Sequence, residues 1–250
     1  MKRLVRILLG LILLPLCFGL TKALVGQLSS VGKLSGRQLY FLLGFAGYFI
    51  LELLFFKPIR TYIFGHELTH AFWSLIFGGK VKGLKVSKSG GSVLLTKTNL
   101  LVTLAPYFFP IYTFLVLALY FLFRIFVKTY PEHFTFLQES HLQTIMLFLV
   151  GFTLLEMAYH SVIFLTGFTL AFHLALTFDS LSMRQSDIYK TGIFFSLVFI
   201  LIANLIVVML VLKLVWPTQI SLGVFFKESL QSTVDLWKNI IIKCKTIIAR

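Results

Sequence analysis

Five long apolar stretches constrain the fold of this chain more than any other feature. Inside a bilayer the backbone cannot bond to water, so stretches of this kind form helices there. Of the 250 residues, 58% are hydrophobic and 13% are charged, which is outside the range of soluble globular domains. The sequence therefore predicts an all-α, multi-pass integral membrane protein. The apolar stretches are residues 7–20, 40–56, 100–123, 142–178 and 191–215.

Two of these stretches are expected to be irregular. Ala105-Pro106 and Pro110 fall inside the stretch 100–123, and proline removes a helical hydrogen bond, so a bend or break is predicted there. The stretch 142–178 is too long for one untilted span. We expect a span followed by a broken or re-entrant segment, with Gly167 as the break.

The two ends of the chain carry positive charge beside apolar residues. Lys2, Arg3 and Arg6 precede the first apolar stretch, a pattern shared by signal peptides and first membrane spans. We favour a retained anchor, because Lys22 interrupts the small-residue pair that resembles a cleavage site. Beyond Pro217, apolar residues recur every three or four positions among lysines, which predicts an amphipathic helix at the membrane surface. The alternative is a helix packed on another subunit. The predicted regions are an anchor and connector (1–38), a membrane domain (39–215) and a cationic tail helix (216–250).

A short lysine-rich segment interrupts the helical pattern. Residues 80–96 space valines and leucines among lysines around Ser89-Gly90-Gly91-Ser92, a turn-forming sequence. The pattern predicts a small β-hairpin, and a plain basic loop is the alternative.

The segment His66-Glu67-Leu68-Thr69-His70 is an HExxH motif on a predicted helix. Residues four apart on a helix lie on one face, so two imidazoles can bind a zinc ion there with a carboxylate beside it. Apolar residues flank the motif, which predicts a membrane-embedded helix. Zinc binding, worth about 10 to 16 kcal/mol in small peptides, offsets the cost of burying these polar groups. The alternative is a helix that keeps the same residues for packing.

The charge content restricts which partners the chain can bind, and the cysteine content restricts its disulfides and metal sites. Lys and Arg outnumber Asp and Glu by 23 to 9, which favours anionic lipid headgroups. Nucleic acid is excluded as a partner, because the basic residues lie in short loops and form no long stripe with interleaved aromatics. Cys17 and Cys244 belong to no CxxC pair, so neither a disulfide framework nor a thiolate metal site is expected.

Several polar residues fall within apolar stretches. We interpret Glu52, Glu156, His160 and His173 as interior residues bonded to neighbouring helices. Glu156 and His160 share a helix face, so a role in completing the zinc site is the alternative.

These features resemble the site-2-protease-like intramembrane zinc metalloproteases, in particular their compact bacterial and plastid relatives. The resemblance rests on the HExxH motif in an apolar helix, on Gly78-Gly79 followed by a lysine-rich hairpin, and on a downstream aspartate at the mouth of a later span. Leu104-Ala105-Pro106-Tyr107 also stands where the family often has an Ala-Gly-Pro turn. The resemblance as a whole covers roughly residues 59–192.

The resemblance implies an aspartate as the third zinc ligand. The Leu-Asp-Gly signature of the family is absent, and Phe178-Asp179-Ser180 and Ser186-Asp187-Ile188 compete for its place. We favour Asp187, because it opens the last span as the ligand aspartate does in the family, with Asp179 as second choice. Either aspartate can instead be a helix cap.

The resemblance also implies a function. It predicts an intramembrane zinc endopeptidase of the bacterial inner membrane, with His66 and His70 as ligands and Glu67 as general base. Its substrate would be a membrane-embedded or membrane-adjacent protein. The hairpin pattern by itself motivates a further hypothesis, in which an extended segment of the substrate pairs with a strand edge of the hairpin. The alternative is a non-catalytic assembly or partner-binding protein that retains the protease fold.

Overall fold

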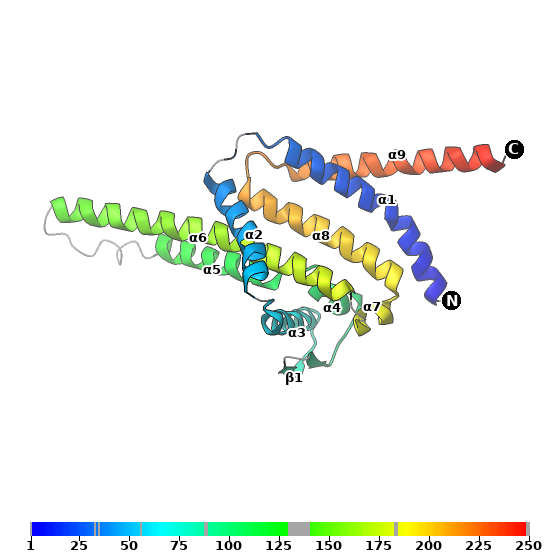
Figure 1. Cartoon of the computed structure of the whole chain (residues 1–250), viewed down its shortest axis with the longest axis horizontal. Coiled ribbons are helices and arrows are strands. Elements are labelled where there is room, and N and C mark those ends of the chain that lie inside the picture. The colour runs from blue at the N-terminus through cyan, green and yellow to red at the C-terminus, as the bar shows by residue number, and fades with distance from the viewer. Residues whose placement is uncertain are drawn as a thin grey trace. The chain divides into compact units, whose positions relative to one another are not determined.

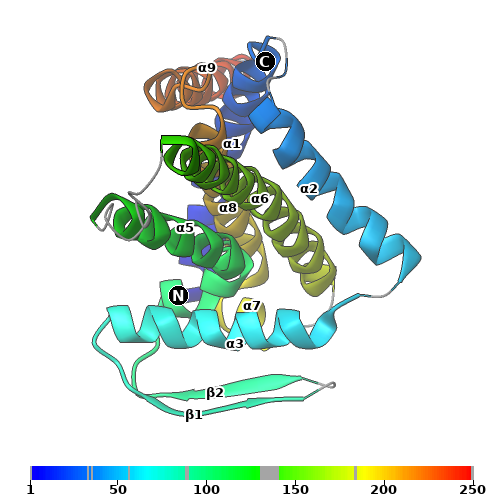
Figure 2. The ribbon, with the colours of Figure 1, turned by 90° about the vertical axis from the view of Figure 1, so that its left-hand side faces the viewer.

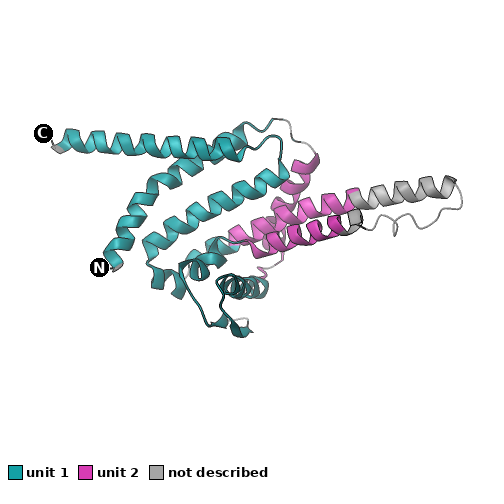
Figure 3. Ribbon diagram, turned by 180° about the vertical axis from the view of Figure 1, so that it is seen from behind, with its two compact units in different colours: residues 1–34, 59–109, 176–250 teal, residues 35–58, 110–175 magenta. Residues whose placement is uncertain are grey.

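The structure is a computed structural model that describes residues 2–32, 34, 36–55, 57–87, 90–129, 141–182 and 185–248. Side chains are described for the same residues except 2, 126–129, 141–155 and 248. The chain divides into two compact units, which are described separately (Figure 3). Unit 1 comprises residues 1–34, 59–109 and 176–250, and unit 2 comprises residues 35–58 and 110–175.

Within the described residues, four helices are long and apolar enough to cross a membrane, or up to five if one bent pair counts as a single span. This supports the prediction of a mostly helical membrane protein. The helix that carries the HExxH motif is not one of these candidate spans, so its location in the membrane stays a prediction. The four candidates are Arg3–Ser29, Gly36–Leu54, Glu156–Ser182 and Ile193–Val215, and the bent pair is Leu100–Tyr107 with Ile111–Ile125.

Three long helices of unit 1 pack side by side (Figure 1). They are α1 (Lys2–Ser29), α8 (Ile193–Val215) and α9 (Leu222–Ile248), with α1 in contact with both of the others. A side chain at Gly19 would collide with the main chain of Ser229, so α1 and α9 approach closely only because Gly19 has none. The tail is thus a helix, as expected, and its first half packs on α1.

The exposed surface of α9 is amphipathic. Phe226, Leu230, Val234 and Ile241, four residues of the apolar stripe predicted for the tail, are exposed, whereas Phe225 packs inward and is fully buried. Lysines such as Lys227 and Lys238 are exposed among them. The interfacial location of the helix stays a prediction. The predicted stripe also comprises Trp237, Cys244 and Ile248.

The HExxH motif lies on α3 (Ile59–Ile76), which is followed by an antiparallel hairpin of β1 (Val81–Val86) and β2 (Gly91–Leu95). Both strands lie alongside α3 (Figure 2). At the end of α3, Gly78 adopts a φ of 70°. The amides of Gly78 and Gly79 donate to the carbonyls of Leu75 and Ser74, a left-handed cap that releases the chain into β1. The predicted hairpin is confirmed.

The chain then breaks at the expected prolines. Helix α4 (Leu100–Leu104) begins at Asn99, whose side chain accepts a hydrogen bond from the amide of Val102 at 2.8 Å. The 3₁₀ turn η1 (Ala105–Tyr107) follows and contributes to a buried cluster with residues of α7 and α8. The cluster comprises Leu104, Ala105, Tyr107, Phe108, Ile188 and Ile200.

A short helix, α7 (Ser186–Thr191), precedes α8. Gly192 separates the two with a φ of 93°, a conformation that favours glycine. Asp187 therefore lies in the first turn of α7, and not at the start of the last span as the sequence suggested.

Unit 2 is formed by α2 (Gly36–Leu54), α5 (Ile111–Thr129) and the part of α6 (His141–Ser182) up to residue 175. The predicted break at Gly167 is wrong, because α6 is helical throughout. A side chain at Gly167 would collide with the main chain of Phe41, and one at Gly44 with that of Phe164. These glycines allow α2 and α6 to approach closely, the usual role of small residues between membrane helices.

Candidate metal centre

Helix α3 supplies two imidazoles to one side of the helix. The ring centroids of His66 and His70 are 4.9 Å apart, and each side chain is 11% exposed. Glu67 is the residue next to His66 and is 8% exposed. The spacing of the motif thus produces the shared face expected from helical geometry.

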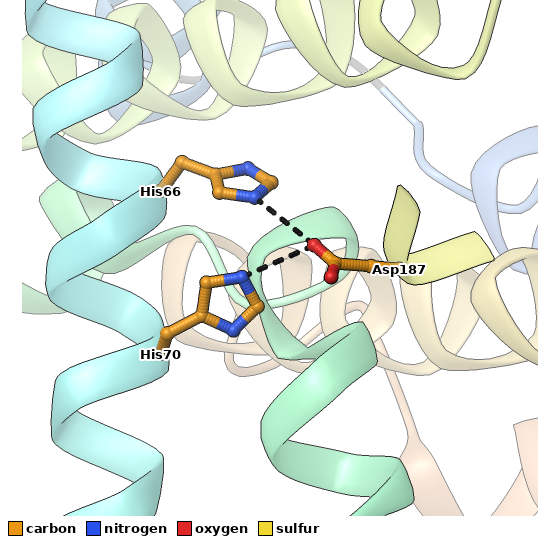
Figure 4. Close-up of side chains that lie close together, drawn as sticks. All are labelled: His66, His70 and Asp187. Carbon is orange, nitrogen blue, oxygen red and sulfur yellow. Dashed lines mark ion pairs between the residues drawn. The ribbon is translucent and has the colours of Figure 1, made fainter. Parts of the chain in front are cut away.

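Asp187 approaches the two imidazoles from α7 (Figure 4). Its Oδ2 lies 3.3 Å from Nε2 of His70 and 3.8 Å from Nε2 of His66. One ligand atom from each of the three residues lies within 4.8 Å of the others. His66, His70 and Asp187 can therefore hold a metal ion.

The separations of these atoms fit a small tetrahedral cation. Bonds of about 2.0–2.2 Å at tetrahedral angles hold ligand atoms about 3.3–3.6 Å apart. The His70–Asp187 separation of 3.3 Å falls in that range, and the His66–Asp187 separation of 3.8 Å is slightly wide of it. The donor set of two nitrogens and one carboxylate oxygen suits a divalent transition metal.

A neighbouring carbonyl orients His70. The Nδ1 of His70 lies 2.7 Å from the main-chain oxygen of Val102, which can only accept, so Nδ1 carries the proton. Nε2 is thereby left facing Asp187. It donates to the carboxylate when protonated, and its lone pair is available to a metal when it is not, the arrangement common among metal-binding histidines. The cap at Asn99 holds the first turn of α4, which contains Val102. The Nδ1 of His66 is buried and makes no hydrogen bond within the described part of the chain.

The two rings favour the ionised form of the Asp187 carboxylate. Burial by itself raises the pKa of Asp187, but its contacts with His66 and His70 outweigh burial and hold the pKa well below the ordinary value. A carboxylate in this state is ready to bind a cation.

Glu67 packs against the first residue of β2. A Cβ on Gly91 would lie 2.7 Å from Cγ of Glu67 and 2.9 Å from its Oε1, so only glycine fits there. We interpreted Gly91 from the sequence as a turn residue. Its close approach to Glu67 could not be inferred from the turn pattern, because the contact joins α3 to a strand 24 positions later.

A cavity of about 320 Å³ opens beside the three metal-binding candidates. Glu67, His70 and Asp187 line it, together with much of β2. The hairpin contains two strands, so the edge of β2 that does not pair with β1 is without a partner strand among the described residues. The remaining lining residues are Gly91, Ser92, Val93, Leu95, Thr98, Val102, Thr103, Ser186 and Lys190.

Tyr107 is a site residue that we did not identify as functional from the sequence. It is fully buried, and its ring centroid lies 5.1 Å from that of His66. Its buried hydroxyl interacts with the Asp187 carboxylate, a candidate ligand. The only sequence signal was its position at the end of Leu104-Ala105-Pro106-Tyr107. Tyr107 therefore belongs to the surroundings of the candidate metal centre.

The other candidate residues lie outside this group. Asp179 on α6 interacts electrostatically with Tyr62 and is not among the three metal-binding candidates. In unit 2, Glu156 and His160 approach each other at 3.9 Å, and the ring centroid of His160 lies 4.4 Å from that of Tyr40. The prediction of an interior residue bonded to a neighbouring helix is wrong for Glu156, which is exposed and pairs with His160 on its own helix. His160 does contact Tyr40 on the neighbouring helix α2.

Two further predicted polar residues, and the cysteines, also lie outside the group. Glu52 pairs with Lys57 at 3.0 Å, and His173 is buried. Cys17 and Cys244 are both free thiols.

Comparison with protein-family models, with curated proteins and with solved structures finds no match. The resemblance to site-2-protease-like enzymes stays a prediction.

Proposed function

We propose that this protein is an intramembrane zinc endopeptidase that hydrolyses a peptide bond in a membrane-embedded or membrane-adjacent protein. The observation that carries the proposal is the approach of Asp187, from a helix more than a hundred positions away, to the two histidines of the HExxH motif. A motif kept only for packing does not require a distant carboxylate at that position. The bacterial inner membrane is proposed on the resemblance alone.

Zinc is the proposed cofactor because of the ligand set. Hydrolytic zinc sites have three protein ligands and leave a fourth position open, and His66, His70 and Asp187 supply three. When bound, zinc would lower the pKa of a water toward about 7 and polarise the carbonyl of the substrate.

Glu67 is the proposed general base. Its carboxylate lines the cavity, so it can take a proton from the attacking water and pass it to the nitrogen of the leaving amine. Tyr107 is the proposed donor to the carbonyl oxygen of the substrate. The oxygen gains negative charge as water adds, and the buried Tyr107 hydroxyl, which is close to the candidate ligand Asp187, can donate a hydrogen bond to it.

The free edge of β2 is the proposed binding surface for the substrate. Val93 and Leu95 belong to β2 and line the same cavity as Glu67 and Asp187. An extended peptide that pairs with this edge would lie across the candidate metal centre. Such pairing uses main-chain groups, so the substrate segment must be unwound from its helix but needs no specific amino-acid sequence.

A comparison of Glu67→Gln with wild type tests the proposal. Both proteins, purified in detergent, receive one equivalent of zinc and labelled casein as an unstructured polypeptide probe. We expect wild type to cleave casein and a chelator to stop it. Glu67→Gln should keep its zinc by elemental analysis but cleave roughly 10²- to 10⁴-fold more slowly, because general-base catalysis contributes about that much.

Glu228→Gln on α9 is the matched control, since it removes one carboxylate outside the candidate site, and it should cleave at the wild-type rate. Wild-type cleavage no faster than that of Glu67→Gln would overturn the proposal in favour of the non-catalytic alternative.

A further inference from the structure

A second cavity of about 700 Å³ lies in unit 1, between the first turns of α1 and the junction of α7 with α8. It is separate from the cavity beside the candidate metal centre, and the two share no lining residue. Its lining residues are Arg3, Arg6, Ile7, Tyr189, Gly192, Ile193, Phe194 and Phe195.

The charged part of this cavity is cationic. Arg3 and Arg6 are three positions apart on α1, so they share a helix face. Nη1 of Arg6 donates to the carbonyl of Lys190 at 2.8 Å, which ties the guanidinium to the end of α7. A guanidinium has five N–H donors, so Arg6 keeps others for an anion. Among the described residues, no carboxylate lines the cavity beside the two arginines.

The rest of the lining is mainly apolar. Ile7 and Phe194 line it beside the arginines, and a Cβ on Gly10 would lie 2.7 Å from the ring of Phe194, so α1 and α8 are closely packed here. Both helices are candidate membrane spans, and both begin at this cavity (Figure 1). Where spans begin, lipid phosphates meet acyl chains. A soluble anion would interact with the arginines alone, whereas a phospholipid would also bury its acyl chains against Ile7 and Phe194.

We infer that this cavity binds an anionic phospholipid. The phosphate lies between Arg3 and Arg6, because the planar guanidinium donates two parallel hydrogen bonds to phosphate oxygens. The part of the acyl chains nearest the headgroup contacts Ile7 and Phe194. Two arginines in one cavity favour a headgroup of net negative charge over a zwitterionic one.

The lipid site is connected to the helix that carries Asp187. The Arg6–Lys190 hydrogen bond joins the lipid site to α7, three positions after Asp187. A lipid held by Arg6 would therefore brace the helix that carries Asp187. The inference itself depends on neither zinc nor proteolysis.

Native mass spectrometry of the full chain in detergent tests the site. Wild type and Arg3→Gln/Arg6→Gln are titrated with phosphatidylglycerol and, separately, with phosphatidylcholine. Each arginine near an anionic lipid contributes about fivefold, so phosphatidylglycerol binding should fall roughly thirtyfold in the double variant. Phosphatidylcholine should bind wild type weakly.

Two further variants keep the test decisive. Lys243→Gln/Lys245→Gln removes the same charge from exposed positions of α9, outside the cavity, and should bind phosphatidylglycerol as wild type does. Arg3→Gln alone leaves the Arg6–Lys190 bond intact and should lose roughly fivefold.

Three results would overturn the inference. Equal losses in the two double variants would indicate general charge attraction, and no loss in Arg3→Gln/Arg6→Gln would indicate that the cavity does not bind the lipid. Displacement of bound phosphatidylglycerol by millimolar inorganic phosphate would indicate a site for free phosphate.

Discussion

Replacement of Asp187 by alanine should weaken zinc binding far more than replacement of Asp179. Asp187 is one of three candidate ligands, with Oδ2 at 3.3 Å and 3.8 Å from the two imidazole nitrogens. Zinc binding to structural sites is worth about 10 to 16 kcal/mol, so one ligand of three supplies about 3 to 5 kcal/mol. The dissociation constant for zinc should therefore rise roughly a thousandfold in Asp187→Ala.

Competition with a chromophoric zinc chelator measures this change on the purified protein in detergent. Asp179→Ala is the matched control, because it removes the other candidate aspartate from the same part of the sequence and lies outside the three-residue group. Its zinc affinity should stay within about threefold of wild type, since surface changes away from a site usually have small effects. The reasoning is refuted if Asp187→Ala binds zinc as wild type does, or if both variants lose the same affinity.

Three further variants test the proposed roles of neighbouring residues. Tyr107→Phe should lower kcat for casein roughly 10²- to 10³-fold with zinc content unchanged, as expected for loss of a donor to the oxyanion, and a change in KM alone would contradict that role. Val93→Pro should slow cleavage with zinc content intact, because proline cannot pair along a strand edge, and unchanged turnover would rule out the β2 surface. Gly91→Ala should reduce cleavage while zinc affinity stays near that of wild type, because the added Cβ would collide with Glu67 and Ile63 and not with the histidines. Wild-type cleavage by Gly91→Ala would mean that Glu67 tolerates the shift or is not the base.

Two glycines show which features depend on the local sequence and which depend on tertiary packing. Gly167 in an apolar helix was predicted to break it, yet α6 continues through that residue. Its missing side chain serves the close approach of Phe41 on α2, a contact between helices that are far apart in the sequence. Gly78, in contrast, ends α3 through its left-handed φ, which is a local property of the chain.

The sequence by itself determined the local features of this protein. Apolar stretches of sufficient length indicate membrane helices, and the four-residue spacing of His66 and His70 places both rings on one helical face, because helix geometry involves only neighbouring residues. The tertiary structure decided which distant groups reach that face. Asp187 approaches the rings, Gly91 packs on Glu67, and the Tyr107 hydroxyl is buried beside them. Each of these contacts depends on long-range packing. The sequence favoured Asp187 over Asp179 as the start of the last span, whereas the structure places Asp187 in a separate short helix, and it is the packing of that helix that brings the carboxylate to the rings.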